Sequence, residues 1–333
     1  MRGQRVTFRR FGAIAFAVAV LCCIARPDAL AQQLQVEDKA PLGDVAGRID
    51  HLAVDVAQRR LFVAELGNNS VGIVAIDSRK VVHRITGLKT PQGLSYLTSA
   101  DLLSVANGGD GSVRFFNATS FEPAGQIQLG GDADNIRLDA SGRTFVGYGN
   151  GAIAVIDTAT KRKLSDIPLK AHPEGFQLSR SSPNIFVNVP DKREIAVLDR
   201  DAGKQIASWR LNKGANFPMA LNEESQHVIV AFRNPPTLEV FSARDGSSIA
   251  SVDSCGDSDD VFFDARRHRV YMSCGSGFVD VFDAETGYRR VARVRTIAGA
   301  RTSLFVPELD RLFVAARAAW REGASIWILR PVP

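Results

Sequence analysis

The residues of this sequence that could do chemistry are acids, amides and histidines placed directly before short apolar runs, as in "IDHLAVD", "DADNIRL" and "DSDDVFF". Carboxylates and amides gathered around one opening could bind a cation, an amine, a sugar or a peptide through convergent polar groups. A histidine beside a carboxylate, such as His51 beside Asp50 or His172 beside Glu174, could also act as a base. Aspartate and asparagine also form turns by bonding their own backbone, so polarity alone does not establish a site.

These polar segments recur about every 42 residues. The first apolar residues of the seven units are spaced by 42, 42, 40, 43, 42 and 43, and they are Leu52, Leu94, Ile136, Phe176, Met219, Val261 and Leu304. Within a unit, short alternating or β-branched apolar stretches separated by Gly, Asn, Asp or Ser predict strands. Four short strands per unit, repeated seven times, predict an all-β, seven-bladed β-propeller forming a single domain over residues 32–333.

The last unit ends one strand short of four. It contains "SLFVP", "RLFVAAR" and "SIWILR" and stops at Pro333, whereas "QLQVEDKAPL" before the first unit has the pattern of the missing strand. Pairing of the two ends would close the ring and remove exposed strand edges. We therefore predict that residues 33–42 form the outer strand of the last blade.

The repeats "LFVAELGNNSVGIVAIDSRKVV" and "FVGYGNGAIAVIDTATKRKL" resemble those of the YVTN β-propeller family, whose units read roughly Tyr-Val-Thr-Asn, a short turn and Val-x-Val-Ile-Asp-x-x-Thr. The resemblance extends over essentially all of residues 32–333. It departs from the consensus because "YMSC" and "FVNV" stand where the tetrad would fall. It implies a seven-bladed propeller and often an exported protein, but no single activity, because one fold hosts many functions.

Alignment of the units by their innermost strands predicts one polar face around the mouth of the central channel. The candidate ligand-binding residues there are Asp50, His51, Gln92, Asp134, Asn135, Glu174, Asn216, Asp259, Asp260 and Arg301. The loop after the second strand should return to the same face, where it adds Glu65, Asn68, Asn107, Tyr148, Asn150, Asn188, Arg233 and Arg317. The units carry different residues at equivalent positions, which favours a binding surface over repeated turn chemistry.

The first 31 residues have the pattern of a secretory signal peptide: several arginines, the apolar run "GAIAFAVAVLCCIA" and a small-residue cleavage pattern near Ala31. The run is shorter than the roughly 20 residues that span a bilayer, and no later segment is apolar enough. We therefore expect a periplasmic or secreted protein with no transmembrane segment. Arg9-Arg10 leaves the twin-arginine route open, and Cys22 or Cys23 leaves lipid attachment open.

Removal of that segment would leave Cys255 and Cys274, nineteen positions apart. Cys255 precedes the first strand of the sixth unit and Cys274 ends its second, so antiparallel neighbours would bring both to one face. In an oxidising compartment this predicts a disulfide bond. Two free thiols and a metal site are the alternatives.

The basic balance of the whole chain comes from its first 31 residues. These hold five arginines and one aspartate, which leaves 36 basic and 35 acidic residues in the remainder. A sequence-independent nucleic-acid binder gains affinity from clustered Lys and Arg. The near-neutral remainder argues against nucleic acid and a cell-envelope surface as partners.

Together these patterns favour an exported, monomeric, non-catalytic propeller that binds a small molecule, a peptide or a protein at the channel mouth and needs no cofactor. The alternative is a metal-dependent hydrolase, lactonase or lyase at the same mouth. It would need a divalent cation held by some of Asp50, Asp134, Glu174, Asp259 and Asp260, with His51 beside them. No Gly-x-Ser-x-Gly motif is present to suggest a serine hydrolase.

Overall fold

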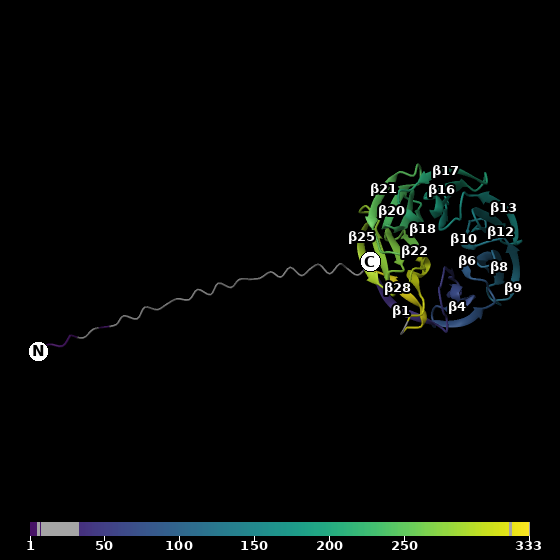
Figure 1. Cartoon of the computed structure of the whole chain (residues 1–333). Coiled ribbons are helices and arrows are strands. Elements are labelled where there is room, and N and C mark those ends of the chain that lie inside the picture. Colours follow the sequence, from purple (N-terminus) through teal and green to yellow (C-terminus); the bar gives the residue numbers. More distant parts are fainter. Residues whose placement is uncertain (5–6, 8–32, 320–321, 333) are drawn as a thin grey trace. The chain divides into compact units, whose positions relative to one another are not determined.

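The computed structural model describes residues 1–4, 7, 33–319 and 322–332, and the chain divides into residues 1–31 and 32–333. The second unit consists of seven four-stranded antiparallel sheets arranged as blades around a central axis (Figure 1). This confirms the predicted all-β, seven-bladed propeller. The expected signal peptide, apart from residues 1–4 and 7, lies outside the described residues.

Each blade contributes one strand to each of four concentric positions. The innermost strands are β2 (Leu52–Asp55), β6 (Pro91–Leu97), β10 (Ala133–Leu138), β14 (Phe176–Leu178), β18 (Gly214–Asn222), β22 (Ser258–Asp264) and β26 (Ser303–Val306). The second strands are β3 (Arg60–Glu65), β7 (Leu102–Asn107), β11 (Arg143–Tyr148), β15 (Asn184–Val189), β19 (His227–Asn234), β23 (Arg269–Cys274) and β27 (Arg311–Ala316).

The two outer positions complete the sheets. The third strands are β4 (Ser70–Ala75), β8 (Ser112–Asn117), β12 (Ala152–Asp157), β16 (Glu194–Asp199), β20 (Pro236–Ser242), β24 (Phe278–Asp283) and β28 (Ala324–Pro331). The outer strands are β5 (Lys80–Ile85), β9 (Pro123–Gln128), β13 (Arg162–Pro168), β17 (Lys204–Arg210), β21 (Ser248–Asp253), β25 (Arg289–Arg295) and β1 (Leu34–Gly43). Four short 3-10 turns are η1 (Leu66–Asn68), η2 (Thr98–Ala100), η3 (Pro190–Lys192) and η4 (Pro307–Leu309).

The position of a strand in its blade explains its composition. The middle strands β3 and β4 read "RLFVAE" and "SVGIVA" and are buried along nearly their whole length, because a neighbouring blade covers each face. The outer strand β5 reads "KVVHRI" and is mostly exposed or half-buried. Continuous apolar runs therefore mark the middle of a blade, and polar interruption marks its edge.

The apolar core lies between the blades. Phe62 and Ile73 of the first blade pack with Leu94 and Val105 of the second, and corresponding clusters of buried residues join each later pair of neighbours. A last cluster joins the seventh blade to the first. Each blade therefore buries its faces only when both neighbours are present.

The ring is closed by the antiparallel pairing of β1 with β28, in the register Leu34↔Pro331 to Gly43↔Ala324. Leu34 and Leu42 of β1 are fully buried in the clusters on either side of this blade. The innermost strands also contact one another around the axis, and β26 returns to β2. The prediction that the N-terminal strand completes the last blade is confirmed.

Cys255 and Cys274 form a disulfide bond with their Cα atoms 5.9 Å apart, which confirms the predicted pairing. The bond ties the loop before β22 to the end of β23, and both residues are buried. In the part of the chain that the structure describes, no helix is long and apolar enough to cross a bilayer.

Deletion of β1 should destabilise the propeller. A chain beginning at residue 44 loses the burial of Leu34 and Leu42, each of which contributes about 1.5–3 kcal/mol, and leaves β28 with an open edge. We expect a lower melting temperature and aggregation, measured by calorimetry and light scattering against a control chain that begins at residue 33. Equal unfolding of the two chains would show that closure does not depend on β1.

Removal of the disulfide should lower stability without changing the fold. Replacing Cys255 and Cys274 with alanine should reduce the free energy of unfolding by about 3 kcal/mol, because the unfolded chain regains the freedom of the closed loop. Denaturant unfolding measures the loss, and wild type under reducing conditions should show a similar one. Wild-type stability that is unchanged by reduction would contradict this role.

Candidate functional site

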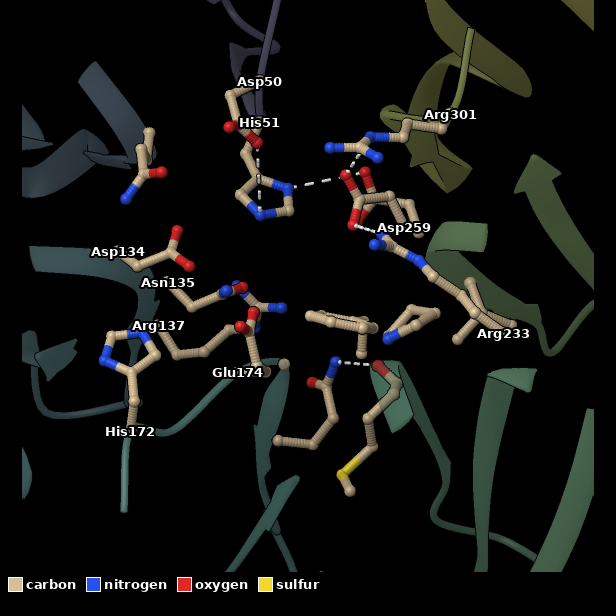
Figure 2. A pocket seen from close by; sticks show the side chains of 18 of the residues that line it. Asp50, His51, Asp134, Asn135, Arg137, His172, Glu174, Arg233, Asp259 and Arg301 are labelled. Carbon is tan, nitrogen blue, oxygen red and sulfur yellow. Dashed lines mark hydrogen bonds and ion pairs between the residues drawn. The ribbon is translucent and has the colours of Figure 1, made fainter. Parts of the chain in front are cut away.

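The channel mouth contains a cavity of about 220 Å³ (Figure 2). The structure brings together most of the residues predicted from the sequence: Asp50, His51, Gln92, Asp134, Asn135, Glu174, Asp259, Asp260 and Arg301 all line it. The lining also includes Arg233, which was expected from a loop, and His172, and it includes residues that the alignment did not place at the mouth: Arg48, Asp132, Arg137, Gly175, Gln177, Phe217, Pro218, Met219, Val261 and Phe262.

β-Bulges at the start of several innermost strands aim these side chains into the cavity. The ladder between β10 and β11 skips from Ala133 to Ile136, and the skipped residues are Asp134 and Asn135. Equivalent irregularities lie at the start of β6, β18 and β22. A bulge leaves residues outside the regular pairing and redirects their side chains, which is why bulges often lie next to binding sites.

Asn216 is the predicted mouth residue that does not line the cavity. It is fully buried, and its Nδ2 donates to Oδ1 of Asn188 at 3.1 Å and to the carbonyl of Glu194 at 3.1 Å. The bulge in β18 spans Phe217 and Pro218, which occupy the mouth instead. The repeat alignment was therefore displaced by one residue in this blade.

The loops after the second strands contribute less than the sequence suggested. Among the eight residues expected there, Arg233 lines the cavity. The buried Asn107 and Asn188 bond nearby backbone atoms, and Tyr148 donates to Asp166. Glu65 is buried against Arg84. Asn68, Asn150 and Arg317 also lie outside the lining.

On one side of the cavity, acids are already matched by arginines. Arg301 Nε lies 2.8 Å from Asp259 Oδ2, its Nη1 donates to Asp257 at 2.9 Å, and Arg233 also donates to Asp259. Arg233 in turn lies over the ring of Phe217 at 3.9 Å. Figure 2 shows Asp259 held between the two guanidinium groups. This ion-pair network leaves Asp259 little capacity to bind a cation.

His51 is held between two carboxylates. Its Nδ1 lies 3.4 Å from Asp260 Oδ2, and its Nε2 lies 3.8 Å from Asp50 Oδ1. Burial alone would lower the pKa of His51, but the carboxylates of Asp260, Asp50 and Asp134 outweigh it and raise the pKa to about 10. His51 is therefore a cation at neutral pH and not a free base.

Asp134 and Glu174 lie on the opposite side of the cavity (Figure 2). In the described part of the chain, neither carboxylate has a hydrogen bond or an ion pair closer than 4.0 Å. Burial, with the charges of Asp50 and Glu174, raises the pKa of Asp134 to about 8. Burial, with the charges of Asp259 and Asp132, raises the pKa of Glu174 to about 7. Among the described residues that line the mouth, these two are consequently the acids without a close partner.

Arg137 and Gln177 line both this cavity and a more apolar one of about 320 Å³. Gln177 Nε2 donates to the carbonyl of Met219 at 2.7 Å, which links two neighbouring blades across the channel wall. The spacing of the repeats gave no signal for these residues, because they follow the aligned apolar position instead of preceding it.

His172 does not pair with Glu174 as a base would require. Its Nδ1 lies 2.6 Å from the carbonyl of Gly149 and, in the neutral ring, donates to it. Its Nε2 lies 3.9 Å from Asp132 Oδ2, and Asp132 also accepts from Gln92 at 3.1 Å. His172 is thus part of a polar group at the rim.

The described residues contain no group of three or more His, Cys, Asp or Glu side chains placed to hold a metal ion. Among the acids that the metal-dependent alternative could use, Asp134 and Glu174 lie across the mouth from Asp259 (Figure 2). Asp259 is held by Arg233 and Arg301, and Asp260 accepts from the backbone N–H of Ser303 at 2.8 Å.

Comparisons with known proteins identify the fold. No protein-family model matches the sequence, and no curated protein matches it. Among solved structures, the chain is similar to Kuenenia stuttgartiensis hydrazine synthase, with a TM-score of 0.71 and 16% identity over 82% of this chain and 93% of that one. At this identity the similarity shows the propeller fold alone.

The unpaired carboxyl group of Asp134 should lower the stability of the fold at high pH. The pKa of Asp134 is about 8 in the folded protein, against an ordinary value of 3.8. Because the folded state holds the proton more tightly, stability falls as pH rises from about 4 to about 8. We expect Asp134→Asn to melt at a higher temperature than wild type at pH 8 to 9, with the difference shrinking towards pH 4.

Thermal unfolding across this pH range measures the effect, and Glu285→Gln, at an exposed position, provides the control. A difference between Asp134→Asn and wild type that does not vary with pH would contradict an unsatisfied carboxyl at the mouth.

Proposed function

We propose that this protein is an exported, non-catalytic β-propeller that binds a small ligand carrying a positively charged group, such as an ammonium, at its channel mouth. The observation that carries the proposal is the unpaired pair of carboxyl groups, Asp134 and Glu174, in a cavity where the other acids have partners. The volume of about 220 Å³ suits a small molecule better than a protein segment.

The energetics of the two carboxyl groups support this proposal. Two half-buried carboxylates repel one another and lose hydration, so they retain protons at neutral pH. An ammonium between them would relieve the repulsion and replace the lost hydrogen bonds. A cationic ligand is therefore bound more tightly by these two groups than by Asp259, which two arginines already neutralise.

The alternative of a metal-dependent hydrolase, lactonase or lyase draws less support from the same geometry. It would draw its ligands from Asp50, Asp134, Glu174, Asp259 and Asp260, yet Asp259 is held by Arg233 and Arg301, and Asp50 is paired with Arg48. His51 lies between Asp50 and Asp260 as a cation, so neither of its ring nitrogens has a lone pair free to coordinate a metal ion.

Export and family membership complete the proposal. We infer delivery to the periplasm or the exterior from the signal-peptide pattern of residues 1–31, and the Cys255–Cys274 disulfide is compatible with an oxidising compartment. The repeats support placing the chain among YVTN-type propellers.

The proposal is tested by calorimetric titration of the mature protein with n-propylamine, putrescine, calcium and manganese at pH 8. We expect the amines to bind, and Asp134→Asn/Glu174→Gln to abolish that binding. Affinity in wild type should rise between pH 6 and pH 8.5, because Asp134 and Glu174 must lose their protons before they can pair with an ammonium.

The control variant Glu285→Gln/Glu308→Gln removes the same charge at exposed positions and should bind as wild type does. Melting curves establish that every variant is folded. Equal amine binding by wild type and the mouth variant would overturn the proposal, as would the absence of amine binding. Tight calcium or manganese binding that depends on Asp134 and Glu174 would favour the metal-dependent alternative instead.

A further inference from the structure

We propose that the ligand is a small zwitterion, with an ammonium bound by Asp134 and Glu174 and a carboxylate bound by Arg137. This inference rests on the proposed function and specifies the chemical class of its ligand. Its central observation is the guanidinium group of Arg137, which lines the mouth without a carboxylate partner among the residues that the structure describes.

Arg137 differs from the other arginines of the cavity. Arg48 is paired with Asp50 at 3.1 Å, and Arg233 and Arg301 share Asp257 and Asp259. Arg137 Nη1 donates to the carbonyl of Ile136 at 2.8 Å. Within the described ranges, no carboxylate oxygen lies within 4.0 Å of its guanidinium group.

Burial removes part of the hydration of the Arg137 guanidinium group, and no ion pair with a described carboxylate offsets that loss. Burial lowers the pKa of Arg137, while the charges of Asp260 and Asp134 act on it from a greater distance. The group lies 5.5 Å from the ring centre of Phe176. Arginine binds a carboxylate through two parallel hydrogen bonds, so it is suited to an anionic group that enters the cavity.

A ligand that carries both a positive and a negative charge would pair with the acids and with the guanidinium group of the mouth at the same time. A simple amine would satisfy Asp134 and Glu174 and leave Arg137 unpaired, whereas a simple carboxylate would do the reverse. Asp134 and Arg137 belong to the same strand, β10, and line the same cavity of about 220 Å³. The two charges of the ligand should accordingly be a few bonds apart, as in an α-amino acid or a short ω-amino acid.

The test compares amino carboxylates with amines that lack only the carboxylate. The probes are 4-aminobutanoate with n-propylamine, and L-alanine with ethylamine, titrated into wild type by calorimetry at pH 8. We expect at least one amino carboxylate to bind about 10- to 100-fold more tightly than its amine, which is the contribution of a charge-assisted hydrogen-bond pair.

Arg137→Gln should remove the preference for the amino carboxylate over the amine, and it should affect the two ligands differently. Affinity for the amino carboxylate should fall to that of the amine, whereas affinity for the amine should stay constant or rise, because a like charge is lost. Arg289→Gln, at an exposed position on the outer strand β25, is the matched control. The wild-type comparison needs no variant, so it tests the inference even if Arg137→Gln fails to fold.

Two outcomes would overturn the inference while leaving the proposed function standing. The first is equal affinity of wild type for each amine and its amino carboxylate. The second is an equal loss of both ligands in folded Arg137→Gln. If no cationic probe binds to wild type at all, the proposed function itself fails, and the zwitterion fails with it.

Discussion

The antiparallel pairing of β1 with β28 is the interaction on which the rest of the structure depends. Each apolar cluster lies between two blades, so the first and the seventh blades bury both of their faces only when the ring is closed. The mouth has the same dependence, because His51 precedes the first blade and Arg301 precedes the last. The cavity consequently exists only in the closed ring.

Within that ring, charge is matched unevenly around the mouth. Asp259 is neutralised by Arg233 and Arg301. His51 is stabilised as a cation by Asp50 and Asp260. Among the described residues, no ion-pair partner lies close to Asp134, Glu174 or Arg137. Unsatisfied charges lower stability, and a fold tolerates them most readily where they are used in binding.

The innermost strands approach one another closely enough to constrain the residues beside the site. A side chain at Gly93 would place its Cβ 2.0 Å from the carbonyl oxygen of Asp134, and Gly175 donates its N–H to the carbonyl of Phe217 at 3.0 Å. These contacts hold the bulges of adjacent blades against one another. The side chains that project from the bulges are therefore positioned by rigid backbone, as a preformed binding site requires.

The repeat pattern and the residue types were enough to predict the seven blades, an N-terminal closing strand and the bonded cysteines. They also identified nine of the ten mouth residues predicted before the innermost strands, Asn216 being the exception, but only Arg233 of the eight predicted in the loops. These features follow from a periodic apolar pattern, which each unit displays locally. The tertiary structure was needed to show which charged side chains have partners. Arg233 forms an ion pair with Asp259 from another blade, whereas Arg137 lies close to no carboxylate in the described residues. The reason is physical, because a one-residue bulge reorients a side chain and ion pairs form between segments whose distance in space no repeat period specifies.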